Sequence, residues 1–233
     1  MAAHIGIVGC SAEGAALCYR TICAEGAAAL GGAHRHPEVS LHTHSLHRYV
    51  ERLDAGDLQG VADLMLDSAR KLARCGADFL VCPDNTIHQA FALVRERSPL
   101  PWLHIADVVA EEALRRGFRK IGITGTHWLV RSEVYPERLR AQGLDFARPT
   151  ESQSAGMGRL IMDELVCGIQ TPAQVDYLRG VIEGLKAQAC DAVVLGCTEL
   201  PLILNDGNSP LPTLDSTRLL ARAALRRAVA TSG

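Results

Sequence analysis

Two short apolar segments of this chain each occur a second time, at nearly the same separation along the sequence. Residues 5–9 (IGIVG) return as residues 121–125 (IGITG), 116 positions later, and residues 78–81 (DFLV) return as residues 191–194 (DAVV), 113 positions later. Each segment has the composition of a buried strand that ends in a turn of small residues. Two similar offsets in the same order predict a duplicated α/β unit. Chance matching of short apolar segments remains the alternative at this point.

Strand-like segments alternate with longer helical patterns, which predicts parallel βαβ units whose strands are buried on both faces. The expected strands are 4–9, 39–43, 78–82, 101–105, 120–125, 191–196 and a weak one near 211–214. The expected helices are 12–30, 57–75, 86–97, 107–116, 130–142, 156–168, 173–189 and 216–230. We therefore expect an α/β fold of two similar lobes, each a short parallel sheet flanked by helices. The N-terminal lobe would comprise 1–112 plus 213–233 and the C-terminal lobe 113–212, related by a pseudo-twofold axis with the site in the cleft between them.

Composition excludes several classes of partner. The formal charge of −2 argues against a nucleic-acid surface or a polybasic membrane anchor, and no apolar stretch approaches the length of a membrane span. The eight cysteines form no CxxC pair, which favours reduced thiols and a cytoplasmic location. The glycine patterns of nucleotide-binding loops are incomplete, so no nucleotide cofactor is expected.

The repeat offset brings two chemically active side chains into correspondence. Position 197 minus 113 is 84, so Asp84 corresponds to Cys197, Asn85 to Thr198 and Thr86 to Glu199. Each lobe thus offers a proton-carrying side chain at the end of a buried strand, followed by an expected helix N-terminus. Such a terminus favours a thiolate and can hold a substrate carboxylate. Two opposed acid/base groups suit the removal of a proton from one face of a carbon and its return to the other.

These motifs resemble the aspartate/glutamate racemase superfamily. The resemblance rests on Gly196-Cys197-Thr198-Glu199 after one strand and on Asn85-Thr86-x-His88 after its counterpart. Residues 6–9, Gly125-Thr126 and residues 215–218 agree with that family in order and spacing. The resemblance implies a two-lobed α/β fold, no pyridoxal or metal cofactor, a homodimer, and racemisation at the Cα of a small carboxylate substrate such as aspartate or glutamate.

Residue roles follow from the repeat and the resemblance together. Asp84 and Cys197 would be the catalytic pair on opposite faces of the substrate. The expected substrate-binding residues are Ser11, Arg48, Asn85, Thr86, Thr126 and Thr198. The alternatives are that Asp84 and the hydroxyl residues only cap helices, and that Arg48 is a solvated charge. Glu199 is expected to fix a neighbour or cap its helix, and His88 to brace the turn.

Two departures from the family pattern leave the reaction open. Relatives usually have Cys, or Thr in some branches, where this chain has Asp84, and Cys82 lies two residues earlier, roughly 6–7 Å away on a strand. In addition, residues 154–159 contain no Lys to hold a second substrate carboxylate. One alternative is a diacid cis–trans isomerase or decarboxylase that uses Cys197 alone. The other is a non-catalytic ligand-binding homologue.

Five histidines cluster between residues 34 and 47. They are His34, His36, His42, His44 and His47. His-x-His spacing on a strand places both rings on one face, as metal sites sometimes require. No Cys or carboxylate completes an obvious ligand set in the sequence, so no metal is expected here.

Overall fold

The computed structural model describes residues 2–230 and divides the chain into two compact units. Unit 1 extends to Val108 and resumes at Thr217, and unit 2 is Val109–Ser216. Each unit is built on one four-stranded sheet with every strand pairing parallel. The strand orders are β2-β1-β3-β4 and β6-β5-β7-β8, the same order when each number is raised by four. This identity of topology confirms the two similar α/β lobes expected from the repeat.

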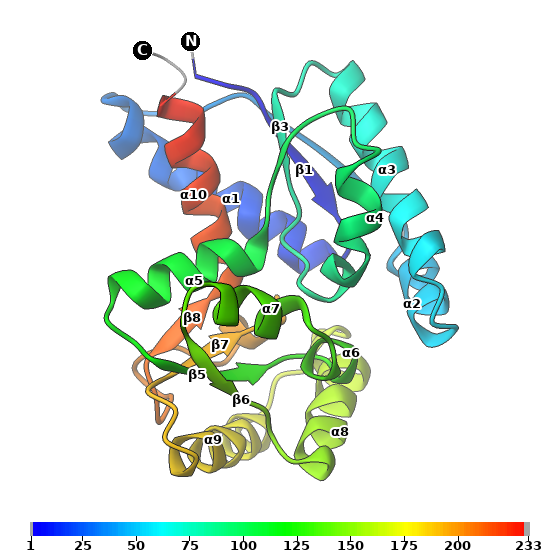
Figure 1. Ribbon diagram of the computed structural model, residues 1–233. Helices are drawn as coiled ribbons and strands as arrows, with labels where there is room; N and C mark the ends of the chain where they lie inside the picture. Colours follow the sequence, from blue (N-terminus) through cyan, green and yellow to red (C-terminus); the bar gives the residue numbers. More distant parts are fainter. Residues whose placement is uncertain (1, 231–233) are drawn as a thin grey trace. The chain divides into compact units, whose positions relative to one another are not determined.

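The elements alternate along the chain as βα units (Figure 1). The first unit contains β1 (Ile5–Gly9), α1 (Ala12–Leu30), β2 (Val39–Thr43), α2 (Leu46–Asp54), α3 (Leu58–Arg74), β3 (Phe79–Val81), a 3-10 helix (Thr86–Ala90), α4 (Phe91–Arg95) and β4 (Trp102–Leu103). The second contains β5 (Lys120–Thr124), α6 (His127–Arg131), α7 (Val134–Ala141), β6 (Asp145–Ala147), α8 (Glu151–Arg159), a π-helix (Leu160–Leu165), α9 (Pro172–Ala187), β7 (Ala192–Leu195), a 3-10 helix (Leu200–Leu202) and β8 (Thr213–Asp215). Helices α5 (Ile105–Arg115) and α10 (Ser216–Ala230) include residues of both units.

Equivalent aspartates connect the two central strands of each sheet, β1 with β3 and β5 with β7. In unit 1, the backbone N–H of His4 donates to Asp78 Oδ2 at 2.7 Å. In unit 2, the N–H groups of Arg119 and Lys120 donate to the two carboxylate oxygens of Asp191 at 2.8 and 3.1 Å. The repeat noticed in the sequence therefore includes a repeated hydrogen bond between neighbouring strands.

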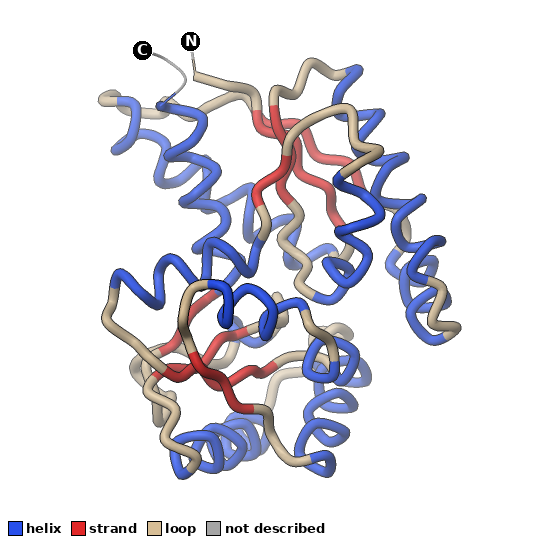
Figure 2. The backbone as a smooth tube through the Cα atoms, in the orientation of Figure 1, coloured by secondary structure: helices blue, strands red, loops and turns tan. Residues whose placement is uncertain are grey.

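The central strands β1 and β3 of unit 1 are buried on both faces, which explains their uninterrupted apolar sequences. Because side chains alternate along a strand, Phe79 and Val81 of β3 pack on one face and Leu80 on the other. The first face is covered by apolar residues of α1 and α10, and the second by residues of α3 and α4. Figure 2 shows this sheet between its helices.

The core of unit 2 forms where α8 and α9 cover β7. Val193 and Leu195 of this strand pack with Met157 of α8 and with Leu178 and Leu185 of α9, all fully buried or nearly so. Gly122 on the neighbouring β5 leaves the space that Leu185 fills, since a Cβ there would come 2.9 Å from Leu185 Cδ1.

Several elements differ from the sequence expectation. The expected helix 130–142 is divided into α6 and α7 because Ser132 is extended, at φ −77° and ψ 171°. The expected helix 86–97 begins as a 3-10 helix, and the expected helix 156–168 continues from α8 into a π-helix. The sequence analysis missed α2, which buries only Tyr49, and β6, whose three residues include an exposed Asp145. The three residues of β6 are too few to show a period. The apolar residues of α2 do have helical spacing, at Leu46, Tyr49, Val50 and Leu53, so this helix could have been predicted.

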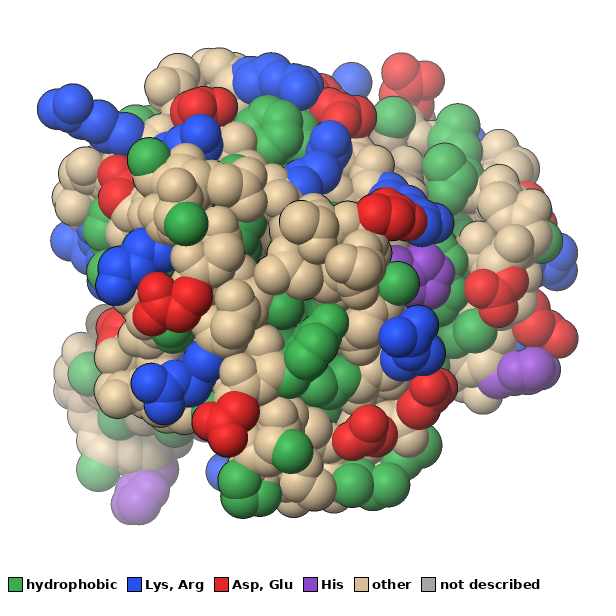
Figure 3. All heavy atoms as spheres, turned by 90° about the horizontal axis from the view of Figure 1, so that it is seen from below, with side chains coloured by type: hydrophobic (Ala, Val, Ile, Leu, Met, Phe, Trp, Pro, Cys, Tyr) green, Lys and Arg blue, Asp and Glu red, His purple; other side chains and the backbone are tan. Residues whose placement is uncertain are grey.

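Charges of both signs mix on the face shown in Figure 3, where Lys and Arg side chains lie among Asp and Glu side chains. This agrees with the near-neutral composition. Among residues 2–230, no helix combines the length and the apolar character needed to cross a membrane.

Candidate active site

The site residues of unit 1 gather at the carboxyl end of its two central strands. Ser11 follows β1, and Asp84, Asn85 and Thr86 follow β3. These strands pair in parallel with Ile7 opposite Val81, so the segments that leave them start at the same edge of the sheet. Ser11 caps α1, because its side-chain oxygen accepts from the backbone N–H of Gly14 at 3.1 Å.

Asp84 closes the turn after β3 with its own carboxylate. Its Oδ1 accepts from the N–H of Thr86 at 3.0 Å and from the N–H of Ile87 at 3.3 Å. Charge-assisted bonds of this kind stabilise an ionised carboxylate and hold its direction. The capping role left open by the sequence is therefore present. Both bonds use the same oxygen, and a proton-transfer role for Asp84 remains compatible with them.

The His88 side chain supports this turn through hydrogen bonds and packing, as the sequence suggested. Its Nδ1 lies 2.7 Å from the Asp84 carbonyl oxygen, and its Nε2 accepts from the N–H of Ile105 at 3.5 Å. A neutral imidazole with an accepting Nε2 carries its proton on Nδ1, so we assign Nδ1–H as the donor to Asp84. The ring also stacks on Phe91, at 5.7 Å between centroids, and meets His104 edge-on at 4.7 Å. The turn that carries Asp84 thus rests on a packed aromatic cluster.

Cys82 is a core residue of unit 1. It packs with Leu80 on the face covered by α3, and it is fully buried. Burial, followed by the nearby Asp84 charge, raises the pKa of the Cys82 thiol well above its ordinary value. Its Sγ lies 3.7 Å from the Asp84 carbonyl oxygen, a contact that helps to shape the turn. This environment disfavours Cys82 as a substitute base.

Unit 2 repeats the arrangement. Thr126 follows β5 and caps α6, with its side chain accepting from the N–H of Leu129 at 3.3 Å. Cys197 follows β7, and these two strands pair with Thr124 opposite Leu195. Between them the N–H of Gly196 donates to the Thr124 carbonyl at 3.0 Å. A Cβ at Gly196 would overlap that carbonyl oxygen, so only glycine permits this close approach ahead of Cys197.

The Cys197 thiol faces a buried carboxylate. Its Sγ lies 2.9 Å from Oε2 of Glu199, and the Thr198 hydroxyl donates to the same oxygen at 2.8 Å. All three residues are at most 9% exposed. From the sequence, Glu199 is expected only to fix a neighbour or to cap its helix. The structure places Glu199 in direct contact with the thiol, where it can hold or exchange the thiol proton.

The sequence predicted a helix N-terminus behind each reactive group, and the two units differ here. In unit 1, a 3-10 helix begins at Thr86 and continues directly into α4, so a helical segment follows Asp84 as expected. In unit 2, only a three-residue 3-10 helix follows Glu199. A dipole built from so few peptides gives little stabilisation to a thiolate, so Cys197 lacks the helix on which that expectation depended.

Arg48 follows β2, whereas the other predicted residues of unit 1 follow β1 and β3. It is exposed on α2, in the connection that follows β2, and its Nη1 lies 3.0 Å from His44 Nδ1. The structure therefore gathers the other predicted residues at two strand edges: Ser11, Asp84, Asn85 and Thr86 in unit 1, and Thr126, Cys197 and Thr198 in unit 2. The contact between Arg48 and a substrate carboxylate stays a prediction.

Comparison with protein families decides the relationship. The model described as Asp/Glu/Hydantoin racemase matches residues 7–224. The chain belongs to this family. The family membership confirms the resemblance that was based on the turns after β3 and β7. It also confirms the expectation that the protein is an isomerase of the amino-acid racemase type.

Individual members of the Asp/Glu/Hydantoin racemase family agree with this assignment. The broad specificity amino-acid racemase RacX of Bacillus subtilis is 25% identical over 164 residues, which are 69% of each chain. The glutamate racemase of Mycobacterium leprae is 33% identical over 133 residues, which are 55% of this chain and only 46% of that enzyme.

Solved structures match nearly the whole chain, which is more than the curated relatives match. A Yersinia pestis protein proposed to be an Asp/Glu racemase superposes with a TM-score of 0.87 and 31% identity, covering 97% of this chain and 99% of that one. An aspartate racemase homologue from Pyrococcus horikoshii OT3 gives a TM-score of 0.81 and 26% identity, with 98% and 99% covered.

Proposed function

We propose that this protein racemises a small amino acid, with an acidic amino acid such as aspartate or glutamate as the preferred substrate. Asp84 and Cys197 would act on opposite faces of the same Cα. The observation that carries the proposal is the placement of a carboxylate and a thiol at equivalent strand ends of two topologically identical sheets. The proposal requires those two strand edges to face one substrate.

The hydrogen-bonded state of each group gives the direction of the first half-reaction. Asp84, stabilised as a carboxylate by two N–H donors, would take the proton from Cα, while the Cys197 thiol would deliver its proton to the other face. After this half-reaction, Asp84 is protonated and Cys197 is a thiolate. The enzyme in that form is ready for the opposite enantiomer, or it returns to its first form by exchange with solvent.

Glu199 provides a route for that exchange. Its Oε2 accepts from the thiol, so after turnover Glu199 would take a proton from solvent and pass it to the Cys197 sulfur. Thr198 holds the same oxygen in place. We propose Glu199 as a positioning and proton-relay residue for Cys197.

The substrate carboxylate needs donors at the strand ends. Ser11, Asn85, Thr86, Thr126 and Thr198 lie at the two edges that carry the reactive groups, together with the backbone N–H groups of their turns. Donors of this kind stabilise the negative charge that grows as Cα loses its proton. This chemistry needs no pyridoxal cofactor and no metal.

Aspartate and glutamate are the first substrates to test. Relatives of this chain carry the names aspartate racemase homologue, glutamate racemase and broad specificity amino-acid racemase. Arg48 is the candidate partner for a carboxylate, since its guanidinium can bind both oxygens at once. The absence of Lys from 154–159 favours one well-held carboxylate over two.

A panel of single L- and D-amino acids in D₂O tests the proposal. We expect deuterium at Cα of aspartate or glutamate with the native protein and none with Cys197→Ala. Cys190→Ala is a matched control, because Cys190 is a buried cysteine of the same unit that takes no part in the proposed chemistry. Absence of exchange with every member of the panel would contradict the proposal.

One observation favours a second candidate. Asp84 Oδ1 is committed to two backbone bonds, and a carboxylate used mainly as a cap leaves Cys197 as the sole reactive group. A diacid cis–trans isomerase or decarboxylase would work with that single thiol. Product analysis with maleate and with a substituted malonate distinguishes this function, because maleate has no stereocentre and loss of CO₂ is not racemisation.

We further propose a cytoplasmic homodimer. All eight cysteines are free thiols, which fits a reducing compartment. Light scattering coupled to size-exclusion chromatography would give twice the chain mass of 25.0 kDa for a dimer.

A further inference from the structure

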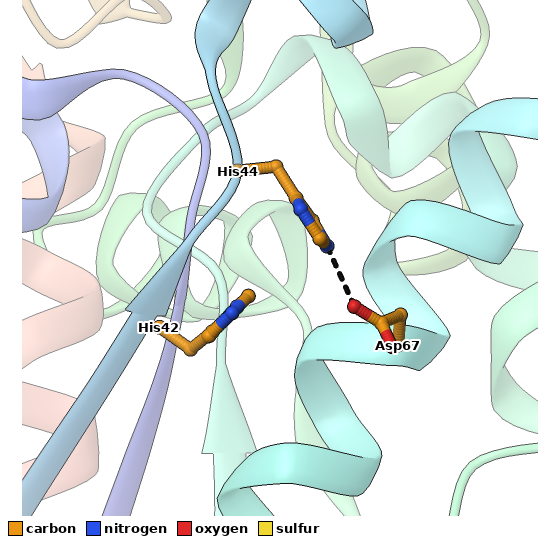
Figure 4. A group of neighbouring side chains, drawn as sticks. All are labelled: His42, His44 and Asp67. Carbon is orange, nitrogen blue, oxygen red and sulfur yellow. Dashed lines mark ion pairs between the residues drawn. The ribbon is translucent and has the colours of Figure 1, made fainter.

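A cluster of metal-binding side chains lies in unit 1 between β2 and α3. His42 lies in β2, His44 directly follows this strand, and Asp67 comes from α3 (Figure 4). One donor atom from each of the three lies within 4.8 Å of the other two. In the sequence, no Cys or carboxylate completed an obvious ligand set with the His-x-His pair. The fold supplies one from 23 residues further along the chain.

The geometry points to a site for a divalent transition metal ion, and we propose Zn²⁺ bound by His42, His44 and Asp67 with water as the fourth ligand. Two imidazole nitrogens and one carboxylate oxygen are ligands that Zn²⁺ accepts at about 2.0–2.2 Å. The three donor atoms lie within 4.8 Å of one another, close enough to surround a single ion. The site lies outside the proposed catalytic residues and does not depend on the racemase proposal.

His42 is already arranged as a ligand. The Lys71 ammonium, which can only donate, lies 3.2 Å from His42 Nε2, so that nitrogen presents its lone pair. The proton is therefore on Nδ1, which lies 2.9 Å from the Ser68 hydroxyl oxygen. A hydrogen bond from the second ring nitrogen is the outer support that zinc-bound histidines commonly have.

Lys71 shows that the cluster already accommodates a positive charge. Its Nζ also lies 2.7 Å from Asp67 Oδ2, so it contacts two of the three proposed ligands. The metal would take the place of this ammonium. The Lys71 side chain is 37% exposed and flexible, and it can turn into solvent.

His44 must change its tautomer. Arg48 donates to Nδ1 at 3.0 Å, so the proton lies on Nε2, which is 2.9 Å from Asp67 Oδ2. Binding through Nε2 transfers that proton to Nδ1 and releases Arg48, which is exposed on α2. The ring stays neutral in both forms, so the change needs no additional proton.

Charge and access agree with the proposed ligand set. Burial, and after it the charge of Lys71 at His42 and of Arg48 at His44, lowers the pKa of both rings, which favours neutral imidazole. A cavity of about 370 Å³ borders His44 and Asp67 and provides a path from solvent.

Titration of the whole protein with Co²⁺, followed by competition with Zn²⁺, tests the site. A four-coordinate Co²⁺ complex absorbs in the visible range, and thiolate ligands add a charge-transfer band in the near ultraviolet. Because Cys75 and Cys167 are exposed, the titration is done in a background with both changed to Ser. We expect one Co²⁺ per chain, visible absorption without the thiolate band, and displacement by Zn²⁺.

Single variants decide which residues bind. His42→Gln and Asp67→Asn should each weaken binding by about tenfold or more, and Lys71→Met should strengthen it by removing the competing ammonium. His47→Gln is the matched control, because His47 is an exposed neighbour that pairs with Glu51. Circular dichroism confirms that each variant is folded.

Three results would overturn the inference. They are no visible band with the Lys71-containing protein, binding that His42→Gln and Asp67→Asn leave unchanged, and weakening by His47→Gln as large as that by His42→Gln.

Discussion

The Cys197 sulfur lies 2.9 Å from a carboxylate oxygen of Glu199, two residues further along the chain. The thiol is therefore not an isolated group at a strand end. The negative carboxylate of Glu199 disfavours a negative charge on the neighbouring sulfur. The same carboxylate can exchange a proton with the thiol. This pair gives the proposed reaction a proton donor that is ready when substrate binds.

Replacing Glu199 with Gln should keep the shape of the site and remove the charge. We expect Glu199→Gln to lower the racemisation rate by about 10²-fold, in the range for loss of one acid/base partner. Deuterium incorporation at Cα measures the rate, and circular dichroism confirms that the variant is folded. A folded variant with the native rate would contradict a role for Glu199 beyond packing.

Two substitutions at Asp84 separate its two roles. Asparagine keeps an oxygen that can accept from Thr86 and Ile87 but cannot take a proton, so Asp84→Asn should fold normally and lose about 10²–10⁴-fold in rate. Asp84→Ala removes the cap as well and should cost about 1 kcal/mol of unfolding free energy.

Urea unfolding and Cα exchange, measured on both variants, check this division. Native activity in Asp84→Asn would show that this carboxylate is only a cap. The function that uses Cys197 alone would then be favoured.

Cysteine labelling of the folded protein should follow burial. Burial raises the pKa of Cys18 to about 12, and that of Cys82 also lies well above its ordinary value, so neither presents a thiolate near neutral pH. We expect Cys75 and Cys167, which are exposed, to react with iodoacetamide first. Peptide mapping by mass spectrometry identifies the order. Labelling of Cys82 as fast as that of Cys75 would show that the β3 turn is open.

Asp206 should make stability depend on acid pH. Burial acts to raise the pKa of Asp206, but the hydroxyl and N–H of Thr213, both 2.7 Å from its Oδ1, and the charge of Arg116 outweigh it and leave the pKa below its ordinary value. A lowered native pKa means that the carboxylate stabilises the fold above about pH 4, and that this contribution is lost as the pH falls through the native value.

Asp206→Ala should therefore cost about 1 kcal/mol at pH 7 and less as the pH falls below 4. Urea unfolding at pH 7, 5 and 3.5 measures the difference between variant and native protein. An equal difference at all three values would rule out the charge as its source.

The sequence predicted the central strands well because they are buried on both faces. Such strands form continuous apolar segments, and β1 and β7 are fully buried along their length. The repeat also predicted that Asp84 corresponds to Cys197. The two residues follow equivalent strands, β3 and β7, because both sheets have the same parallel topology. Short edge strands such as β6, which has three residues, have no comparable pattern.

The chemistry around the site residues could not be predicted in the same way. Nothing in the residues near Cys197 shows that Glu199 turns back to the thiol, because that depends on the path of the turn after β7. The approach of Asp67 to His42 depends on how α3 packs on β2, which periodicity does not determine. Contacts of this kind arise from tertiary packing, and sequence spacing alone does not contain them.

The most direct test of two opposed proton-transfer groups is the position of solvent deuterium at early conversion. L-aspartate, or the best substrate of the panel, is incubated in D₂O and the two enantiomers are separated before much product forms. Our account predicts one deuterium at Cα of the D-product, delivered from the face opposite the one deprotonated, while the remaining L-substrate keeps its protium. Deuterium rising equally in both enantiomers, or a D-product that retains the substrate's own hydrogen, would contradict it.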